Sequence, residues 1–366
     1  MCKIQKGGDG SLNVRMMPFI NPAVECILML GRRFTQISDA PTCVRDQVQQ
    51  ESEKNNLQMQ TQAQEVTALA EMEQRLVDRL SAPEETLRLY FSRTETPLNT
   101  LAWALYFLDQ ARIDFSCLSP QQQLTECRHL LRQVLNCSQQ ATEAVSDLPS
   151  LSVFLTAKAC SSHIKWAIMH FWCRPAECQA EFRRIMQEAT EILLEDRDVI
   201  TDILSRTAAS RQRFCQQPME QTLEKWSLSR TQDIAVCPSI AEFSSFYVIE
   251  SLWHPGSYWA FVGVMYQPVQ EMIAQVKNSS IYIANGAKAL CDRRRVDILK
   301  ALKSQPLCNQ DLSNLLGLST ATISHHMDNL LMNNFVTTTK RGTRVDYSLN
   351  SPAIRAYLEN ALSELP

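Results

Sequence analysis

Residues 311–331 read DLSNLLGLSTATISHHMDNLL, and this stretch decides the fold of the C-terminal part of the chain. Leucines recur before Gly317 at the spacing of one helical face. Gly317 then supplies the left-handed residue with which many helices end. Ser319 or Thr320 can cap a second helix. The pattern predicts two helices joined by a tight turn, with these residues facing inward: Leu312, Leu315, Leu316, Ile323, Met327, Leu330 and Leu331.

The outer face of the second predicted helix carries small residues, hydroxyls and imidazoles. Such a face can approach the major groove of DNA closely and meet base edges or phosphates. Neighbouring helix positions point about 100° apart, so the adjacent histidines suit DNA better than a shared metal ion. The residues expected at the groove are Ser319, Thr320, Thr322, Ser324, His325 and His326.

A two-stranded wing is predicted to follow. Residues 335–349 begin and end with β-branched and aromatic residues, which are typical of strands. The middle of this segment, KRGTR at 340–344, is a basic, glycine-containing hairpin turn. Lys340, Arg341 and Arg344 would lie where phosphates pass. The order helix, helix, turn, helix and wing is that of a winged helix-turn-helix.

Residues 284–350 resemble the ArsR family of bacterial transcriptional regulators. The similarity rests on three segments: ALCDR at 289–293 with the residues up to Leu302, the helix-turn-helix at 312–331, and the turn at 340–344. The resemblance implies a homodimer that binds double-stranded operator DNA with two-fold symmetry. It also implies that the regulator releases this DNA when it senses a signal. A repressor is the expected type, and an activator is the alternative that the sequence leaves open.

The metal chemistry of the family is not expected in this chain. Family metal sensors often carry a Cys-x-Cys pair before the turn, but here Cys308 is followed by Gln310 at the second place. One thiolate does not build a zinc or arsenic site without partners. The other metal site of the family uses the last helix, and residues 351–364 contain no histidine. We therefore predict no metal and no cofactor.

Composition favours a mostly helical chain with one basic end. Its 366 residues suffice for two or three domains, with only nine glycines and 7% aromatic residues. Between 287 and 350, nine lysines and arginines face five aspartates, a net charge of +4. The whole chain carries −3, so the remainder carries −7. An acidic body with a basic end suits a protein that reads DNA with one domain.

Cysteine content and hydropathy point to a cytoplasmic protein. The thirteen cysteines are scattered through apolar, helical-looking segments, which is typical of reduced thiols. No apolar run approaches the roughly 18–20 residues that span a bilayer, so no membrane association is expected. No phosphate loop, dinucleotide fingerprint or hydrolase motif occurs, and we predict that the chain is not an enzyme.

The predicted fold class is mainly α: a large N-terminal helical domain with a small β-hairpin region, then an α+β winged helix-turn-helix. Residues 234–238 and 242–249 are rich in β-formers and would make a small hairpin or sheet. The predicted domains are a disordered start at 1–17, a sensor and dimerisation domain at 18–280, the DNA-binding domain at 281–350, and a C-terminal helix at 351–366 that contributes dimer contacts. Helical stretches are expected at about 84–93, 99–113, 120–138, 151–173, 175–207, 217–229, 264–278 and 284–302.

Two Cys/His pairs at helical spacing stand outside the DNA-binding domain: Cys160 with His163, and His170 with Cys173. Each pair shares a helical face, but thirteen residues separate the outer cysteines, about 20 Å along a helix. Ligands of one ion must lie far closer, so buried thiols and hydrogen-bonded imidazoles are the simpler interpretation. Nearby tryptophans, Trp166 among them, could line a small-molecule pocket or pack in the core. Arg293, Arg294 and Arg295 could contact phosphate or solvent.

The sequence thus predicts a one-component transcriptional regulator whose helical body responds to an unknown signal, with a small-molecule effector as a candidate. Two other classes remain open at this point. The winged helix could dock onto a protein, which would make the chain an interaction module. Alternatively, the body could be a small-molecule-binding or enzymatic domain with an appended DNA-binding domain.

Overall fold

The structure, a computed structural model, describes residues 3–4, 13–35, 41–55, 64–93, 100–135, 137–216, 222, 233–250, 256–277, 279–341 and 344–364. The chain forms two compact units, residues 1–269 and 270–366, and the division falls within α14 (Tyr266–Lys277). The predicted fold class is confirmed, because both units are mainly helical with few strands. Within the described ranges, no helix combines the length and apolar character needed to cross a bilayer.

A five-stranded sheet, in the order β1-β2-β3-β5-β4, forms the β-part of the first unit. β3 pairs in parallel with both β2 and β5, and β4 pairs antiparallel with β5. Val236 lies opposite Met16 on one side and Ala260 on the other. The strands are β1 (Lys3–Ile4), β2 (Asn13–Met16), β3 (Asp233–Ser239), β4 (Phe246–Glu250) and β5 (Ser257–Gly263).

This sheet bears on two expectations. Of the hairpin or sheet predicted at 234–238 and 242–249, the structure has a sheet, in which β5 lies between those two segments and takes β4 as its antiparallel partner. The predicted disordered start differs from the structure at Asn13–Met16, which forms β2 beside β3. The strand at Asn13–Met16 depends on pairing with a segment more than two hundred residues away, which local composition does not encode.

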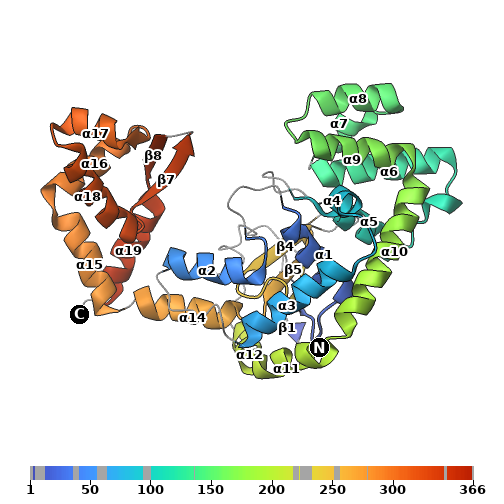
Figure 1. Cartoon of the computed structure of the whole chain (residues 1–366), viewed down its shortest axis with the longest axis horizontal. Helices are drawn as coiled ribbons and strands as arrows, with labels where there is room; N and C mark the ends of the chain where they lie inside the picture. The colour runs from blue at the N-terminus through green and yellow to red at the C-terminus, as the bar shows by residue number, and fades with distance from the viewer. Residues whose placement is uncertain are drawn as a thin grey trace. The chain divides into compact units, whose positions relative to one another are not determined.

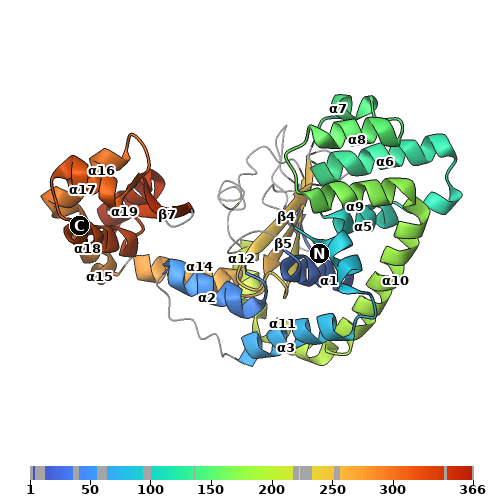
Figure 2. The same ribbon diagram turned by 45° about the horizontal axis from the view of Figure 1, so that its top comes forward.

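Helices surround this sheet in the first unit (Figure 1). In Figures 1 and 2, α6 to α9 gather into one cluster, and the long α10 runs from it towards α11. The helices are α1 (Pro22–Arg33), α2 (Val44–Asn55), α3 (Gln64–Arg79), α4 (Glu84–Phe91), α5 (Leu101–Gln110), the 3-10 turn η1 (Phe115–Cys117), α6 (Pro120–Leu135), α7 (Gln139–Glu143), α8 (Leu148–Thr156), α9 (Ser162–Cys173), α10 (Pro175–Leu194), α11 (Arg197–Arg206) and α12 (Ala208–Gln216).

Several predicted helices are divided. The stretch 151–173 separates into α8 and α9 because Ser161 caps a new helix, accepting a hydrogen bond from Ile164 N at 3.3 Å. The stretch 175–207 separates into α10 and α11. The predicted helix at 217–229 lies outside the described residues, apart from Thr222.

α1 is the central helix of the first unit. Every residue from Val24 to Arg32 is buried, as expected of a helix that is covered on all sides. It contacts α3, α4 and α10, and one core cluster joins it to Ile249 and Phe261 of the sheet. Asn21 caps its start by accepting from Ala23 N at 3.1 Å.

The second unit surrounds a smaller core with a three-stranded sheet in the order β6-β8-β7. The predicted helix at 284–302 is divided by Asp292, whose carboxylate accepts a hydrogen bond from Arg295 N at 3.0 Å. The elements are α15 (Ser280–Cys291), α16 (Arg293–Leu302), β6 (Leu307–Cys308), α17 (Asn309–Leu316), α18 (Thr320–Met332), β7 (Val336–Arg341), β8 (Arg344–Leu349) and α19 (Ser351–Glu364).

Candidate nucleic-acid interface

The turn between α17 and α18 follows the residues that predicted it. Asp311 accepts a hydrogen bond from Cys308 N at 3.1 Å and thereby caps α17. Gly317 is left-handed, with φ 64° and ψ 32°, and ends this helix. Of the two capping candidates, Ser319 is the N-cap of α18, since its Oγ accepts from Thr322 N at 3.1 Å. These caps fix where α18 begins.

The apolar side of α18 holds the helix against the unit's core. Leu312, Ile323, Met327 and Leu330 are fully buried, as predicted. Leu331 is only partly buried. The inward placement of Leu315 is wrong, because 63% of this residue is exposed. The buried residues leave one polar side of α18 facing outward.

Most of the predicted DNA-contacting residues of α18 lie on that outward side. Ser319, Thr320 and His325 are exposed. Thr322 and Ser324 are half-buried; Thr322 Oγ1 lies 2.8 Å from Ser319 Oγ, and Ser324 Oγ accepts from Asn309 Nδ2 at 2.9 Å. Asn309 was not identified from the sequence, and it ties the recognition helix to the start of α17.

His326 is a correction to the predicted DNA-contacting set. It is 8% exposed, and its Nδ1 is buried without a hydrogen-bond partner among the described residues. Burial lowers the pKa of His326, while the nearby carboxylate of Asp292 opposes that shift. The residue therefore belongs to the packing between α18 and the start of α16, where Asp292 lies.

Arg295 also serves the packing of this unit. Its guanidinium donates to Ala289 O at 2.9 Å and to Lys288 O at 2.7 Å. These are the last turn carbonyls of α15, which otherwise lack partners within the helix. The sequence left open whether Arg295 contacts phosphate or solvent. In the structure its side chain does neither, since it binds these backbone carbonyls.

The wing forms as an antiparallel hairpin of β7 and β8 (Figure 1). Lys340 pairs with Val345, and Arg341 pairs with Arg344 next to the turn. The basic residues thus stand at the end of the hairpin. Their side chains lie outside the described part of the structure, so their contact with phosphate stays a prediction.

β6 adds a third strand to the wing and places Cys308 opposite Asp346. Potential ligand atoms of Cys308, Asp311 and Asp346 lie within 4.8 Å of one another and could hold a cation. Asp346 comes from a strand distant in the sequence, so spacing around Cys308 did not reveal it. In the structure, Asp311 is engaged as the cap of α17.

The remaining Cys/His pairs do not join into one site. His163 Nε2 lies 3.0 Å from Arg88 O, and the His170 ring lies beside Arg174. The cysteines of the described residues are all free. The expectation of buried thiols is wrong for Cys173, which is exposed, and Cys160 is only partly buried.

Comparison with known proteins agrees with this geometry. The family described as "Bacterial regulatory protein, arsR family" matches residues 292–338, from the start of α16 into β7. The chain is also 38% identical over 73 residues to an arsenical resistance operon repressor of Staphylococcus aureus, covering 20% of this chain and 70% of that relative. The chain belongs to the arsR family.

A second arsR-family relative is an arsenical resistance operon repressor of Staphylococcus xylosus, 43% identical over 63 residues. That match covers 17% of this chain and 61% of the relative. The predicted resemblance to this family is confirmed. Each of these two matches covers about one fifth of the chain.

Proposed function

We propose that this chain is a one-component transcriptional repressor that binds operator DNA through α18 and its wing. The observation that carries the proposal is the outward polar side of α18, set by the Ser319 cap and by the buried Ile323 and Met327. Small and hydroxyl-bearing residues there suit the major groove. The naming of both relatives as operon repressors supports the direction of regulation.

The proposed DNA contacts divide into two kinds. The residues that would approach base edges or nearby phosphates in the groove are Ser319, Thr320, Ser324 and His325. Lys340, Arg341 and Arg344 would neutralise phosphates beside it. Thr322 is half-buried and its hydroxyl lies near that of Ser319, so it would help to position the first turn of α18 in the major groove. His326 is not included, because it is buried.

A homodimer is the second part of the proposal, and the apolar surface of two adjacent helices supports it. Ile281 of α15 is 73% exposed, and Leu358 and Leu362 of α19 are 47% and 73% exposed. α15 and α19 pack together through Tyr357, whose hydroxyl donates to Ile283 O at 2.6 Å. Large exposed apolar residues on neighbouring elements are typical of surfaces that meet a partner. A second copy would bury them and present two copies of α18.

The dimer has a direct test in sedimentation equilibrium. Leu362→Glu should shift the chain towards the monomer, because it places a charge in the contact. Val153→Glu is the matched control, since Val153 is 74% exposed but lies in α8 of the first unit. An unchanged dimer in the Leu362 variant would refute this contact surface.

The signal is proposed to act on the first unit, in a cytoplasmic and non-enzymatic protein. Gln310 occupies the second place of the Cys-x-Cys pair, which argues against thiolate arsenic sensing of the family type. The large part of the chain before the arsR-family match at 292–338 offers another location for an effector.

Selection of bound duplexes from a random DNA pool tests the DNA-binding proposal. A dimeric winged helix should enrich an inverted repeat whose half-sites are about one helical turn apart, or a multiple of it. Enrichment without symmetry would refute the dimeric reading of the site. Failure to enrich any sequence would instead favour docking of the winged helix onto a protein.

A further inference from the structure

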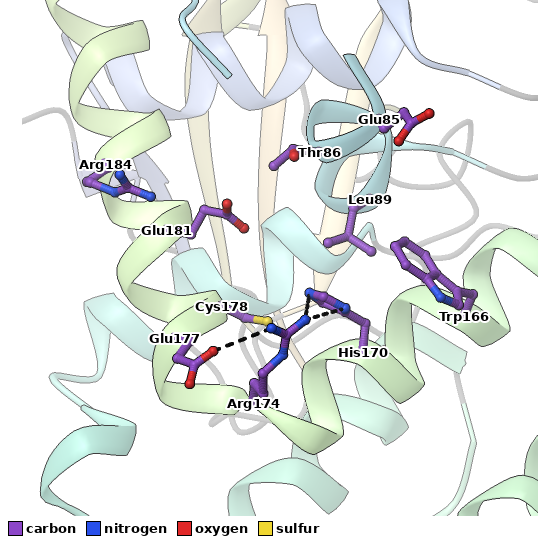
Figure 3. Close-up of a pocket in the computed structure, with 10 residues that line it drawn as sticks. All are labelled: Glu85, Thr86, Leu89, Trp166, His170, Arg174, Glu177, Cys178, Glu181 and Arg184. Atoms are coloured by element: carbon purple, nitrogen blue, oxygen red, sulfur yellow. Dashed lines mark hydrogen bonds and ion pairs between the residues drawn. The ribbon is translucent and has the colours of Figure 1, made fainter. Parts of the chain in front are cut away.

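A polar pocket of about 360 Å³ lies in the first unit between α4, α9 and α10. Figure 3 shows Glu181 and Arg184 along α10, Trp166 and His170 on α9, and Glu85, Thr86 and Leu89 on α4. The volume lies in the range of small-molecule sites, roughly 300–1,000 Å³. The pocket is separate from the DNA-reading unit, which begins at Gln270.

Glu181 is the anchored charge of this pocket. Tyr90, which is fully buried, donates its hydroxyl hydrogen bond to Glu181 Oε2 at 2.7 Å. Burial raises the pKa of Tyr90, so its hydroxyl stays a donor at any physiological pH. The carboxylate is thereby held by a rigid core residue rather than by another surface side chain. A preorganised carboxylate of this kind can bind a ligand without first being ordered.

The guanidinium of Arg174, which also lines the pocket, is already paired with a carboxylate. Arg174 forms an ion pair with Glu177 at 3.7 Å, and its Nη2 lies 3.2 and 3.3 Å from the two ring nitrogens of His170 (Figure 3). Burial, assisted by Arg174, lowers the pKa of His170, which leaves its ring neutral near pH 7. The lining residues then carry three carboxylates against two guanidiniums, a net charge of −1.

An exposed aromatic side chain completes the site. Trp166 is 53% exposed, and its ring lies 5.2 Å from the ring of His170. Leu89 adds a buried apolar side chain to the lining. An indole face packs well against the apolar or aromatic body of a ligand. Carboxylates and an aromatic face in one pocket are a combination suited to an organic cation.

We propose that this pocket binds a small organic cation, an amine or quaternary ammonium compound with an apolar or aromatic body. The cationic head would lie by Glu181, with Glu85 across the pocket, and the apolar body would lie on Trp166 and Leu89. Its role as the effector of the repressor rests on the function proposed above, whereas binding itself does not.

A second hollow, of about 400 Å³, differs in the features that matter. Its Arg88 is paired with Glu84 at 2.6 Å, and its aromatic residue, Phe34, is 3% exposed. No exposed ring is available there among the lining residues that the structure describes. The combination of an anchored carboxylate and an open aromatic face distinguishes the pocket at Glu181.

Calorimetric titration of the full chain without DNA tests the proposal, so a failure of DNA binding would leave the result unaffected. The cationic probes are 2-phenylethylamine, tryptamine and benzyltrimethylammonium. The alcohol 2-phenylethanol and the acid 3-phenylpropionate carry a similar ring without the positive charge. At least one cation should bind with a Kd below about 1 mM, and at least tenfold more tightly than the alcohol or acid.

Two variants locate the binding. Glu181→Gln keeps an acceptor for Tyr90 but removes the charge, and it should weaken cation binding at least tenfold. Trp166→Ala alters an exposed residue and should also weaken binding. Glu191→Gln is the matched control, because Glu191 lies on the same helix and bonds only with Gln187 among described partners.

Three results would overturn the proposal. The first is a Kd above about 1 mM for all three cations. The second is equally tight binding of the alcohol or the acid. The third is a Kd that Glu181→Gln leaves unchanged or that Glu191→Gln weakens to the same degree.

Discussion

A buried carboxyl group in α1 leads to the sharpest prediction about the stability of the first unit. Glu25 is 1% exposed, and its Oε2 accepts hydrogen bonds from Ala241 N at 2.7 Å, Ser239 Oγ at 3.0 Å and Ile240 N at 3.1 Å. Its Oε1 is buried without a partner among the described residues. Burial raises the pKa of Glu25 from 4.5 to about 8, against the lowering effect of these hydrogen bonds.

The sign of the pH dependence follows from the proton count. Between pH 4.5 and 8, the folded chain keeps the proton of Glu25 while the unfolded chain releases it. The unfolded state therefore binds fewer protons, and the free energy of unfolding falls as pH rises. One proton corresponds to about 1.4 kcal/mol per pH unit, so Glu25 should remove about 3 kcal/mol of stability between pH 5 and 7.

Glu25→Gln isolates this effect, since glutamine keeps an acceptor for the three donors and does not titrate. Urea unfolding followed by tryptophan fluorescence is a suitable assay, because all six tryptophans lie in the first unit. The glutamine amide does not titrate, so it changes the free energy of unfolding by the same amount at every pH. The test is therefore the slope of the free energy of unfolding against pH. The native chain should lose about 3 kcal/mol more than the variant between pH 5 and 7. Equal slopes in the two proteins would refute a raised pKa at Glu25.

The second unit yields three further predictions. Gly286→Ala should destabilise it by about 1–3 kcal/mol in urea unfolding followed by circular dichroism, because a Cβ there would lie 2.2 Å from Cε2 of the buried Tyr357; an unchanged midpoint would contradict this packing. Ser319→Ala should cost about 1 kcal/mol by loss of the α18 cap, and unchanged stability would show that the cap is dispensable. In filter binding, Arg344→Ala should weaken binding to operator and random DNA alike, and it should reduce the slope of log binding constant against log salt concentration by about one. His325→Ala should weaken binding to operator more than binding to random DNA. The reverse pattern would exchange the roles assigned to the two residues.

Local signals in the sequence were sufficient for the DNA-reading turn. Gly317 and Ser319 act on their own backbone and the next few residues, so their roles can be predicted without knowledge of the tertiary fold. The wing is likewise a local hairpin with a basic glycine-containing turn. The predicted DNA-contacting set needed correction at His326, which is buried beside the start of α16, a different helix.

The sheet of the first unit could not be predicted in this way. β2 pairs with β3 across more than two hundred residues, and β5 separates two strands that look like a hairpin in sequence. The pocket at Glu181 has the same origin, because its residues come from three helices. A pocket lined by Trp166 was one of two alternatives in the sequence, but nothing near this residue in the sequence indicated Glu181 or the buried Tyr90 that anchors it.

The central claim is that α18 reads a specific DNA sequence, and competition binding tests it most directly. The full chain would be mixed with duplex DNA from just upstream of its own gene, at about 50 and 200 mM salt, with excess random-sequence competitor. We predict binding that withstands the competitor at both salt concentrations and that His325→Ala abolishes under competition. Binding that random DNA removes completely, or that His325→Ala leaves unchanged, would contradict sequence reading by α18.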